Sequence, residues 1–463
     1  MPVSDRTARI VEIYHTAVEG AVWGLPLVLS DLVRRAHPRT DRFYRLPADA
    51  ALLAPGLIGS HGDMAVCSAV LDLSSGPVFL SLPDTGKAYR LLMLVDEWGQ
   101  ILATHNHREN HEGRRDIAIV PHRWDGAPAK GLNVVRSSSD HIWAICHLLE
   151  PMSGAQGLLP ILGRTLPAGA HATERELDTL SLDLQKSFDD TLRAMTPISF
   201  FRRLAKLLPS DPPDPQSADI VRSLHNIGIG SGDPIDGSHD EIIALHEGAV
   251  EGLRRVRRVR PPANDPSQTG WSQAPSGARE PLALLDRAAH VLTGLGAAPA
   301  EEIISFVARA DIGGQLLTGA ADYTLAFAPR SDPPANAFWS LSLTDAQGIS
   351  IGGPMVLVSA RFKSPARGKD GLEIAIRHHL DDAADHGLTA PDGPFGLRLD
   401  IYRPKPGLAR ERWTPPGVVH LGRRHSGART NFAKWPQRIH AQPVFGSSER
   451  GANTRLDQRG PLQ

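Results

Sequence analysis

The sequence predicts an α+β multidomain protein, with two antiparallel β-sandwich units and a mostly helical region between them. Apolar and polar residues alternate in short runs over residues 60–150, and the alternation returns after residue 300. Between these regions the apolar residues fall at helical spacing. A chain of 463 residues is also too long for one ordinary domain. We expect N-terminal helices with a β-sandwich unit at 1–160, a mostly helical region at 161–295, a C-terminal β-sandwich unit at 296–424, and an extended or disordered tail at 425–463.

The N-terminal unit begins with a helical pattern and continues with strands. Residues 4–24 carry an apolar stripe, and we expect Pro26 to interrupt the helix, because proline lacks the backbone N–H that a helix interior uses. Alternating strand patterns start near Val66. The segment PDTGK, residues 83–87, joins two apolar runs and has the Asp-Thr-Gly chemistry of a β-hairpin turn.

The middle region has helical patterns, and strand patterns return after it. Helices are expected over 173–195, over 238–259 and over 280–296, where a glycine ends the pattern. A loop rich in proline, glycine and serine separates the last two helices. The C-terminal unit then shows strands at 321–327, 337–345, 371–379 and 395–404.

The two β-rich units share the same order of strand and loop patterns. Residues 76–99 and residues 321–348 each read as a strand, a loop that contains proline, a second strand, and an acidic residue shortly before a glycine. The run RDIAIVPHRW likewise resembles GLEIAIRHHL. These matches favour an internal duplication.

Charge and cysteine content exclude several classes of protein. Lysines and arginines number 50 and acidic residues 51, so no global field favours nucleic acid or an anionic membrane as a partner. No signal-peptide pattern is visible, and no apolar run reaches the roughly 20 residues that span a bilayer. We expect a cytoplasmic protein with a small-molecule ligand or substrate, and leave homo-oligomer formation open. Cys67 and Cys146 lie in apolar strand patterns, which favours buried, inert thiols and leaves a single bridge open.

The segment THNHRENH, residues 104–111, is the candidate metal site. On a strand, His105 and His107 would point to one face, a spacing compatible with two ligands of a divalent metal. The alternative is an exposed polar loop between strands, where histidines are tolerated. No His-Glu-x-x-His or paired Cys-x-x-Cys motif is present, and the glycines of residues 226–233 lack the dinucleotide-binding spacing. A metal therefore stays open, and no nucleotide cofactor is expected.

Segments along most of the chain carry a family likeness. They are GLPLVLSDLVRR, LDLSSGPVFLSLPDTGKAYRLLMLVDEWG and WDGAPAKGLNVVRSSSDHIWAI in the N-terminal unit, and NAFWSLSLTDAQG, LTAPDGPFGLRLDIYRPKP and RWTPP in the C-terminal unit. With these segments the chain resembles bacterial proteins that pair the domains of unknown function numbered 1254 (N-terminal) and 1214 (C-terminal), up to about Arg424. The resemblance implies a multidomain α+β protein with two β-sandwich units and a helical region. It implies no particular activity.

The likeness breaks at a polar motif just before the first strand. Relatives often carry an Asn-x-Asp-Thr-x-Tyr-like motif there, whereas this chain has His61-Gly62-Asp63-Met64-Ala65-Val66, in which Asp63 persists. His147 stands where relatives commonly have arginine, and Ser305 stands where they often have tyrosine. If these positions line a shared pocket, the pocket of this protein has been rebuilt.

These positions lead to the functional hypothesis. A carboxylate beside an imidazole can set its tautomer and raise its basicity, which makes a general base near neutral pH. We therefore expect a small-molecule enzyme of unknown specificity, in which Asp63 with His61 or His147 performs acid–base chemistry in a pocket of the N-terminal unit. Hydrolysis, isomerisation, cyclisation and elimination all fit. A buried polar pair that only ties a loop to a strand is the alternative for these residues, and a non-catalytic ligand-binding or assembly protein is the alternative function.

Overall fold

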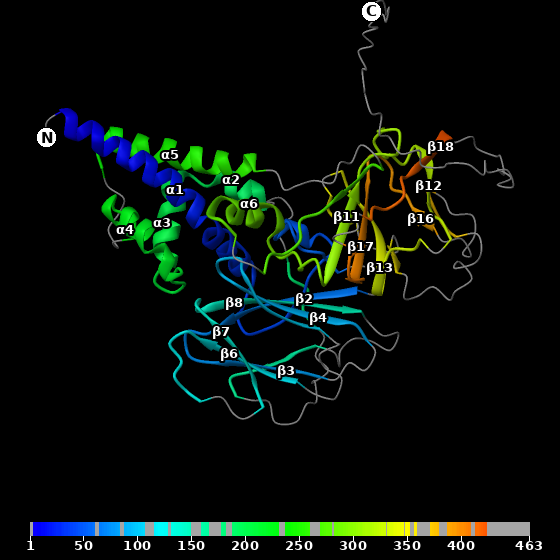
Figure 1. Ribbon diagram of the computed structural model, residues 1–463, viewed down its shortest axis with the longest axis horizontal. Helices are drawn as coiled ribbons and strands as arrows, with labels where there is room; N and C mark the ends of the chain where they lie inside the picture. The colour runs from blue at the N-terminus through cyan, green and yellow to red at the C-terminus, as the bar shows by residue number, and fades with distance from the viewer. Residues whose placement is uncertain are drawn as a thin grey trace, which may run out of the picture. The chain divides into compact units, whose positions relative to one another are not determined.

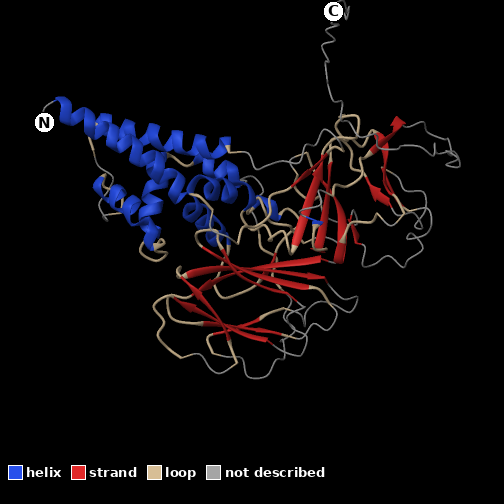
Figure 2. Ribbon diagram, viewed as in Figure 1, coloured by secondary structure: helices blue, strands red, loops and turns tan. Residues whose placement is uncertain are grey.

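The structure is a computed structural model (Figure 1). It confirms the α+β fold, with β-sandwich units near both ends of the sequence and a helical region between them. Figure 2 shows the helices gathered together and the strands in separate groups. The residues that the structure describes are 3–60, 64–83, 88–106, 115–127, 131–149, 159–165, 177–181, 188–230, 237–259, 269–279, 282–329, 331–346, 348–351, 356–358, 371–378, 387–408 and 413–423.

α1 (Val3–Ala36) is one continuous helix that runs through Pro26, so the predicted interruption is wrong. Leu25, Leu27 and Leu29 around the proline are completely buried. Packing of an apolar face stabilises a helix more than one lost hydrogen bond weakens it. By length and composition α1 could cross a membrane, but 89% of its most apolar 18-residue window is buried inside the protein. Core helices and signal sequences share this composition, so the cytoplasmic location stays a prediction.

After α1 the helices are α2 (Phe188–Ala194), α3 (Pro197–Leu207), α4 (Ala218–Asn226), α5 (His239–Arg258) and α6 (Leu284–Gly294), with short 3-10 turns η1 (Ala50–Leu52) and η3 (Pro215–Ser217). Four of these helices, α3, α4, α5 and α6, pack against α1.

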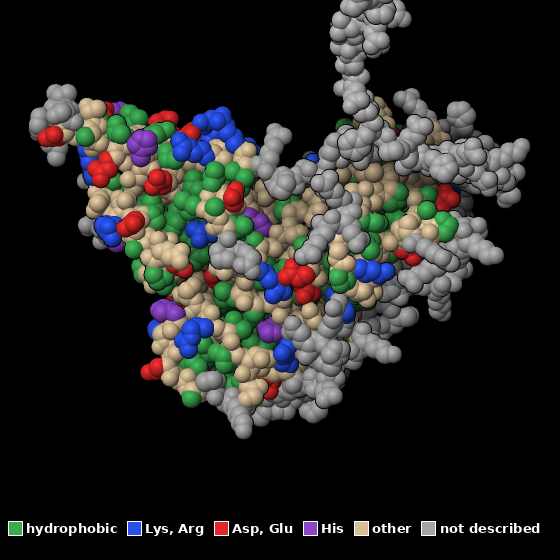
Figure 3. All heavy atoms as spheres, viewed as in Figure 1, with side chains coloured by type: hydrophobic (Ala, Val, Ile, Leu, Met, Phe, Trp, Pro, Cys, Tyr) green, Lys and Arg blue, Asp and Glu red, His purple; other side chains and the backbone are tan. Residues whose placement is uncertain are grey.

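α1 and α5 lie side by side and very close together (Figure 1). A Cβ atom at Gly248 would lie 2.4 Å from the backbone oxygen of Tyr14, so only glycine permits this approach. Ser238 and Glu241 form a capping box at the start of α5, as the predicted helix boundary requires. On the face drawn in Figure 3, acidic and basic side chains are interspersed.

The N-terminal unit is a sandwich of two sheets, with strand orders β1-β2-β8-β4-β5 and β7-β6-β3-β9. Its strands are β1 (Tyr44–Arg45), β2 (Met64–Asp72), β3 (Val78–Leu82), β4 (Arg90–Asp96), β5 (Ile101–Asn106), β6 (Arg115–Pro121), β7 (Asn133–Ser137), β8 (His141–Leu149) and β9 (Ile161–Gly163). The predicted hairpin between β3 and β4 is wrong, because β3 pairs with β6 and β9 while β4 pairs with β8 and β5. A short apolar run with a turn signal marks a strand, but it does not identify the strand's partner.

The C-terminal unit is a second sandwich, with strand orders β10-β11-β17-β13-β14 and β16-β15-β12-β18. Its strands are β10 (Trp271–Gln273), β11 (Ile303–Ala308), β12 (Ala321–Phe327), β13 (Ala335–Thr344), β14 (Val356–Val358), β15 (Leu372–Arg377), β16 (Gly387–Thr389), β17 (Gly396–Pro404) and β18 (Val419–Arg423). β10 comes from the part of the sequence predicted as a loop between helices, and it extends the first sheet of this unit.

The two sandwiches have the same topology. In both sheets each described strand of the first unit has its counterpart nine strands later, and the parallel pair β6–β7 corresponds to the parallel pair β15–β16. Since parallel neighbours are the less common pairing, their recurrence at the same place supports the predicted duplication. The counterparts of β2, β4, β5 and β8 are β11, β13, β14 and β17.

Candidate functional site

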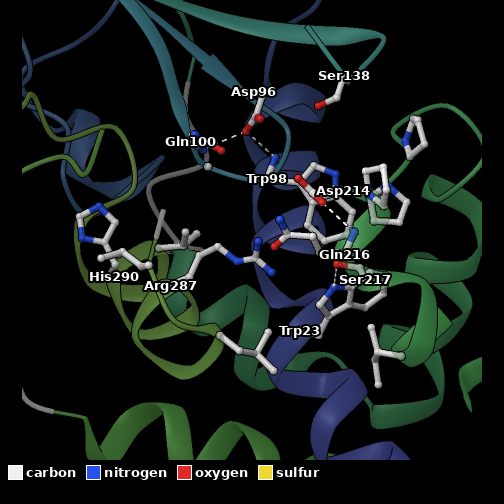
Figure 4. A pocket seen from close by; sticks show the side chains of 18 of the residues that line it. Trp23, Asp96, Trp98, Gln100, Ser138, Asp214, Gln216, Ser217, Arg287 and His290 are labelled. Carbon is white, nitrogen blue, oxygen red and sulfur yellow. Dashed lines mark hydrogen bonds between the residues drawn. The ribbon is translucent and has the colours of Figure 1, made fainter. Parts of the chain in front are cut away.

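A pocket of about 890 Å³ opens where the N-terminal sandwich meets the helices (Figure 4). α1 contributes Trp23, the turn between β4 and β5 contributes Asp96 and Trp98, and α6 contributes Arg287 and His290. Residues 212–220, which include η3, complete the wall. This volume lies in the range of about 300–1,000 Å³ that is typical of small-molecule sites.

Asp96 is held in place by the tight turn that follows β4. Its Oδ1 atom accepts hydrogen bonds from the backbone N–H groups of Trp98 (2.9 Å) and Gln100 (2.8 Å). Gly99 completes the turn with a φ of 78°, a left-handed conformation that favours glycine. The sequence DEWG thus fixes the position of a carboxyl group at one end of the pocket (Figure 4).

The environment of Asp96 changes its acidity. The side chain is 5% exposed, and burial raises the pKa of its carboxyl group to about 6, because a low-dielectric site disfavours the charged form. The hydrogen bonds from Gln100 and Trp98 and the positive charge of Arg287 act in the opposite direction. Asp96 therefore changes its charge close to neutral pH.

Arg287 brings a positive charge into the same pocket. Its guanidinium carbon lies 5.8 Å from the centre of the Trp98 ring, within the range of a cation–π contact. Its Nε atom is buried, and no described residue accepts a hydrogen bond from it. Burial lowers the pKa of Arg287, while Asp96 and Asp214 raise it. The rings of Trp98 and Trp23 lie 5.0 Å apart and form an aromatic wall.

Polar groups at the edge of the pocket are engaged locally. The indole N–H of Trp23 donates to Ser217 Oγ at 3.1 Å, and Asp214 Oδ1 accepts from the N–H of Gln216 at 2.7 Å. Both contacts are drawn in Figure 4. They fix the wall formed by residues 212–220. His290 adds an imidazole, and burial lowers its pKa.

Buried carboxyl groups lie behind the turn. Glu97 is buried next to Asp96, and burial raises its pKa well above the usual range, with the charge of Asp211 adding to the effect. Asp31 on α1 forms ion pairs with Arg34 and Arg203. Glu97 and Asp31 do not line the pocket, so we assign them to the packing between α1 and the sandwich.

The predicted catalytic residues are only partly described. His61 and Asp63 lie outside the described residues, as does the metal candidate His107. His147 is 1% exposed on β8, and His105 is 8% exposed on β5. His147 pairs with Leu91, whereas His105 pairs with the next residue, Leu92.

Adjacent residues of a strand point to opposite faces of the sheet. His105 and His147 therefore do not converge on one cavity. In the described part of the chain, no three His, Cys, Asp or Glu side chains are placed to hold a metal ion.

The two cysteines face each other inside the N-terminal sandwich. Cys67 and Cys146 are register partners on β2 and β8, and both are completely buried. Burial raises the pKa of the Cys146 thiol to about 12, so the reactive thiolate is disfavoured. This agrees with the expectation of buried, inert thiols.

The second unit shows the equivalents of the predicted positions. Val66 pairs with His147 in the first unit, and Ser305 pairs with Asp400 at the matching place in the second. Ser305 Oγ donates to Asp400 Oδ1 at 2.5 Å, and Arg398 Nε donates to the same oxygen at 2.9 Å. At this place in the second unit the polar side chains therefore hydrogen-bond to one another.

In the second unit Ser305 corresponds to Val66. Glu302 lies three residues before Ser305, and Asp63 lies three residues before Val66, so Glu302 corresponds to Asp63. Glu302 is buried, and its Oε1 atom accepts a hydrogen bond from Asn106 Nδ2 at 2.9 Å. The motif position in the second unit therefore joins the C-terminal unit to β5 of the N-terminal unit.

Sequence reasoning missed Asp96, Arg287 and the tryptophan wall as site residues. The signal for Asp96 was visible as an acidic residue before a glycine, at the end of an otherwise apolar strand. No signal marked Arg287, because a single arginine in an amphipathic helix is ordinary.

Comparisons with known proteins identify regions of this chain. Residues 42–153 match the family model described as "Protein of unknown function (DUF1254)", and residues 302–406 match the one described as "Protein of unknown function (DUF1214)". A search of curated proteins found no match.

Two solved structures are similar to this chain. The VPA0106 protein from Vibrio parahaemolyticus has 16% sequence identity and a TM-score of 0.63, covering 89% of this chain and 100% of its own. A putative uncharacterized protein from Burkholderia cenocepacia has 10% identity and a TM-score of 0.40, covering 90% of this chain and 95% of its own. At these identities the likeness to the Vibrio protein shows a shared fold.

Proposed function

Since the chain pairs a DUF1254 region with a DUF1214 region, and neither description names an activity, we propose a function from the pocket itself. The protein is a small-molecule enzyme in which Asp96 transfers a proton to or from a substrate in the pocket between α1, the β4–β5 turn and α6. The observation that carries this proposal is a buried carboxyl group with a pKa of about 6 that lines a pocket of about 890 Å³.

The chemistry follows from the acidity of Asp96. A general acid or base works best when its pKa lies near the operating pH, because both protonation states are then populated. Shifts of this kind, caused by burial beside a named charge, cluster at functional sites. The Oδ1 atom is held by the turn. The reaction classes that fit a single carboxyl group are those expected earlier: hydrolysis, isomerisation, cyclisation or elimination.

The test uses two matched variants. Asp96→Asn replaces the titratable carboxyl group by an amide that does not titrate. Asp345→Asn makes the same change at the equivalent turn of the second sandwich. The proteins are incubated in D2O with small organic compounds, and proton NMR follows exchange or conversion of each compound. We expect turnover by the wild type, a loss of at least about 100-fold in Asp96→Asn, and no change in Asp345→Asn.

One outcome would overturn the assignment: a substrate that Asp96→Asn and wild type convert at the same rate. Compounds that bind and are never altered would favour the second candidate function, a non-catalytic ligand-binding or assembly protein. A specific observation supports that candidate, because the equivalent turn hydrogen bond is accepted by the carboxylate of Asp345, which does not line this pocket. The hydrogen bonds of Asp96 therefore have a structural role whatever its chemistry.

The original candidates stay predictions of their own. Asp63, His61 and His147 are expected to act in the N-terminal unit, and Asp63→Ala with His147→Ala tests them on the same substrates. Unchanged turnover in both variants removes these residues from the mechanism.

A further inference from the structure

We propose that the pocket binds an organic anion, a carboxylate on a flat apolar body, with Arg287 holding the carboxylate and the Trp23–Trp98 wall holding the body. The inference rests on the proposed function only in taking this pocket as the site. Binding of the anion and turnover by Asp96 are tested separately.

Arg287 is the first observation. Its Nε atom is buried and donates to no described residue, although a guanidinium has donors arranged as a fork that fits a carboxylate. Two other arginines of the helical region have partners for this atom: Arg203 Nε donates to Asp31 Oδ2 at 2.6 Å, and Arg255 Nε to Glu251 Oε1 at 2.9 Å. Arg287 instead lies against the Trp98 ring and lines the pocket.

The apolar wall is the second observation. Trp23, Trp98 and Val291 are buried and line the pocket next to the charged group. Aromatic rings favour contact with flat ligands, in offset-stacked or edge-to-face arrangements. A ligand with one charged end and one flat apolar end matches the arrangement of Arg287 and these two indoles.

Acidic side chains also line the pocket and oppose an anion. Glu19, Asp214 and Asp219 are exposed at its edge. Asp219 pairs with Arg222 at 3.2 Å. Exposed charges are screened over about 8 Å at physiological ionic strength, whereas a partly buried guanidinium such as that of Arg287 is screened less. The contact with Arg287 therefore dominates inside the pocket.

Asp96 makes the binding sensitive to pH. Its protonated form can donate a hydrogen bond to a carboxylate, whereas its ionised form repels one. Arg287 from α6, Asp211 from the segment after α3 and Glu97 from the same turn act on Asp96, and His290 lines the same pocket. We expect the affinity for a carboxylate to fall as the pH rises through about 6, the pKa of Asp96.

The experiment measures binding of benzoate, with benzamide as its uncharged analogue, by calorimetry and by quenching of tryptophan fluorescence. We compare wild type with Arg287→Met and Arg287→Lys, and use Arg222→Met as the control for loss of one positive charge near the pocket. We expect benzoate to bind wild type about 10- to 100-fold more tightly than Arg287→Met, since a charge-assisted hydrogen bond stabilises by about 1.5–3 kcal/mol. Arg287→Lys should bind with intermediate affinity, and Arg222→Met as wild type does.

The outcomes separate the two proposals. Equal affinities for benzoate and benzamide in wild type, or unchanged benzoate binding in Arg287→Met, would overturn the anion site, even if Asp96→Asn abolishes turnover. Benzoate binding that depends on Arg287 supports the site, even if no bound compound is ever converted. In Asp96→Asn we expect benzoate affinity to vary much less between pH 5 and pH 7 than in wild type, and a dependence identical to wild type would remove Asp96 from the site.

Discussion

The β4–β5 turn and the β13–β14 turn of the two sandwiches share hydrogen bonds at equivalent positions. The N–H of Asp96 donates to the carbonyl of Gln100 at 3.0 Å, and that of Asp345 to the carbonyl of Ile349 at 2.8 Å. Each carboxylate accepts from the N–H four residues later, at 2.8 Å and 2.9 Å. Gly99 and Gly348 have φ values of 78° and 91°.

The two turns differ in what covers them. Asp96 is buried against a pocket formed with α1 and α6, whereas Asp345 is partly exposed. The turn therefore explains the position of each carboxylate. Burial of Asp96 beneath α1 and α6 explains why its pKa rises to about 6. A motif that is structural in one copy has become a candidate for chemistry in the other through its surroundings.

Alanine at the two turn glycines should give the largest difference. Gly99→Ala places a residue in a left-handed conformation and brings its Cβ atom 2.7 Å from Val291 Cγ2. We expect a loss of about 2–5 kcal/mol in the free energy of unfolding, from backbone strain and overpacking together. Among the described residues, the Cβ atom of Gly348→Ala would meet only Arg309 Nη2, at 3.1 Å, so this variant should lose about 1–2 kcal/mol. Urea denaturation measures both, and equal losses would contradict the closer cover of the first turn.

The pH dependence of stability should separate the two aspartates next. The pKa of Asp96 is about 6 in the folded protein, against 3.8 for an aspartate in an unfolded chain, so the folded state binds more protons between these values. The free energy of unfolding therefore falls as the pH rises from about 4 to about 6, by on the order of 3 kcal/mol from this group.

Asp96→Asn should remove this decrease, and Asp345→Asn should keep it. Denaturation curves at several pH values give the free energy of unfolding of each protein. The difference in this free energy between a variant and wild type isolates the contribution of the substituted carboxyl group. Parallel pH profiles for wild type and Asp96→Asn would show that Asp96 titrates normally.

Removing each carboxylate should have the smallest effect. Asp345→Ala loses the hydrogen bond to the N–H of Ile349 and should cost about 1 kcal/mol. Asp96→Ala at pH 8 loses two such bonds, but it also removes a buried charge, so we expect a net change near zero. At pH 4, where Asp96 is neutral, the loss should be about 1–2 kcal/mol. Thermal denaturation at the two pH values tests this difference between pH 8 and pH 4.

The sequence predicted the fold class and the repeat, because alternation and turn chemistry are local properties. It did not predict the pocket, since Trp23, Asp96 and Arg287 are far apart in the sequence and meet only through helix packing. It did not predict that His105 of the metal candidate and His147 of the catalytic candidate point to opposite faces of the sheet, because that depends on the strand register: His147 pairs with Leu91 and His105 with Leu92. The predicted interruption of the helix at Pro26 is wrong, because burial of the apolar residues of α1 stabilises the helix more than the missing N–H of proline destabilises it.

The close contact between α1 and α5 has a consequence during synthesis. About 220 residues separate the end of α1 from the end of α5, and a ribosome adding about 5–20 residues per second needs roughly 10–45 s to make them. Throughout that interval the apolar face of α1 lacks the helix that covers it. A chain that ends before residue 239 should therefore bind a hydrophobic dye or a chaperone strongly, while the chain that includes α5 should not.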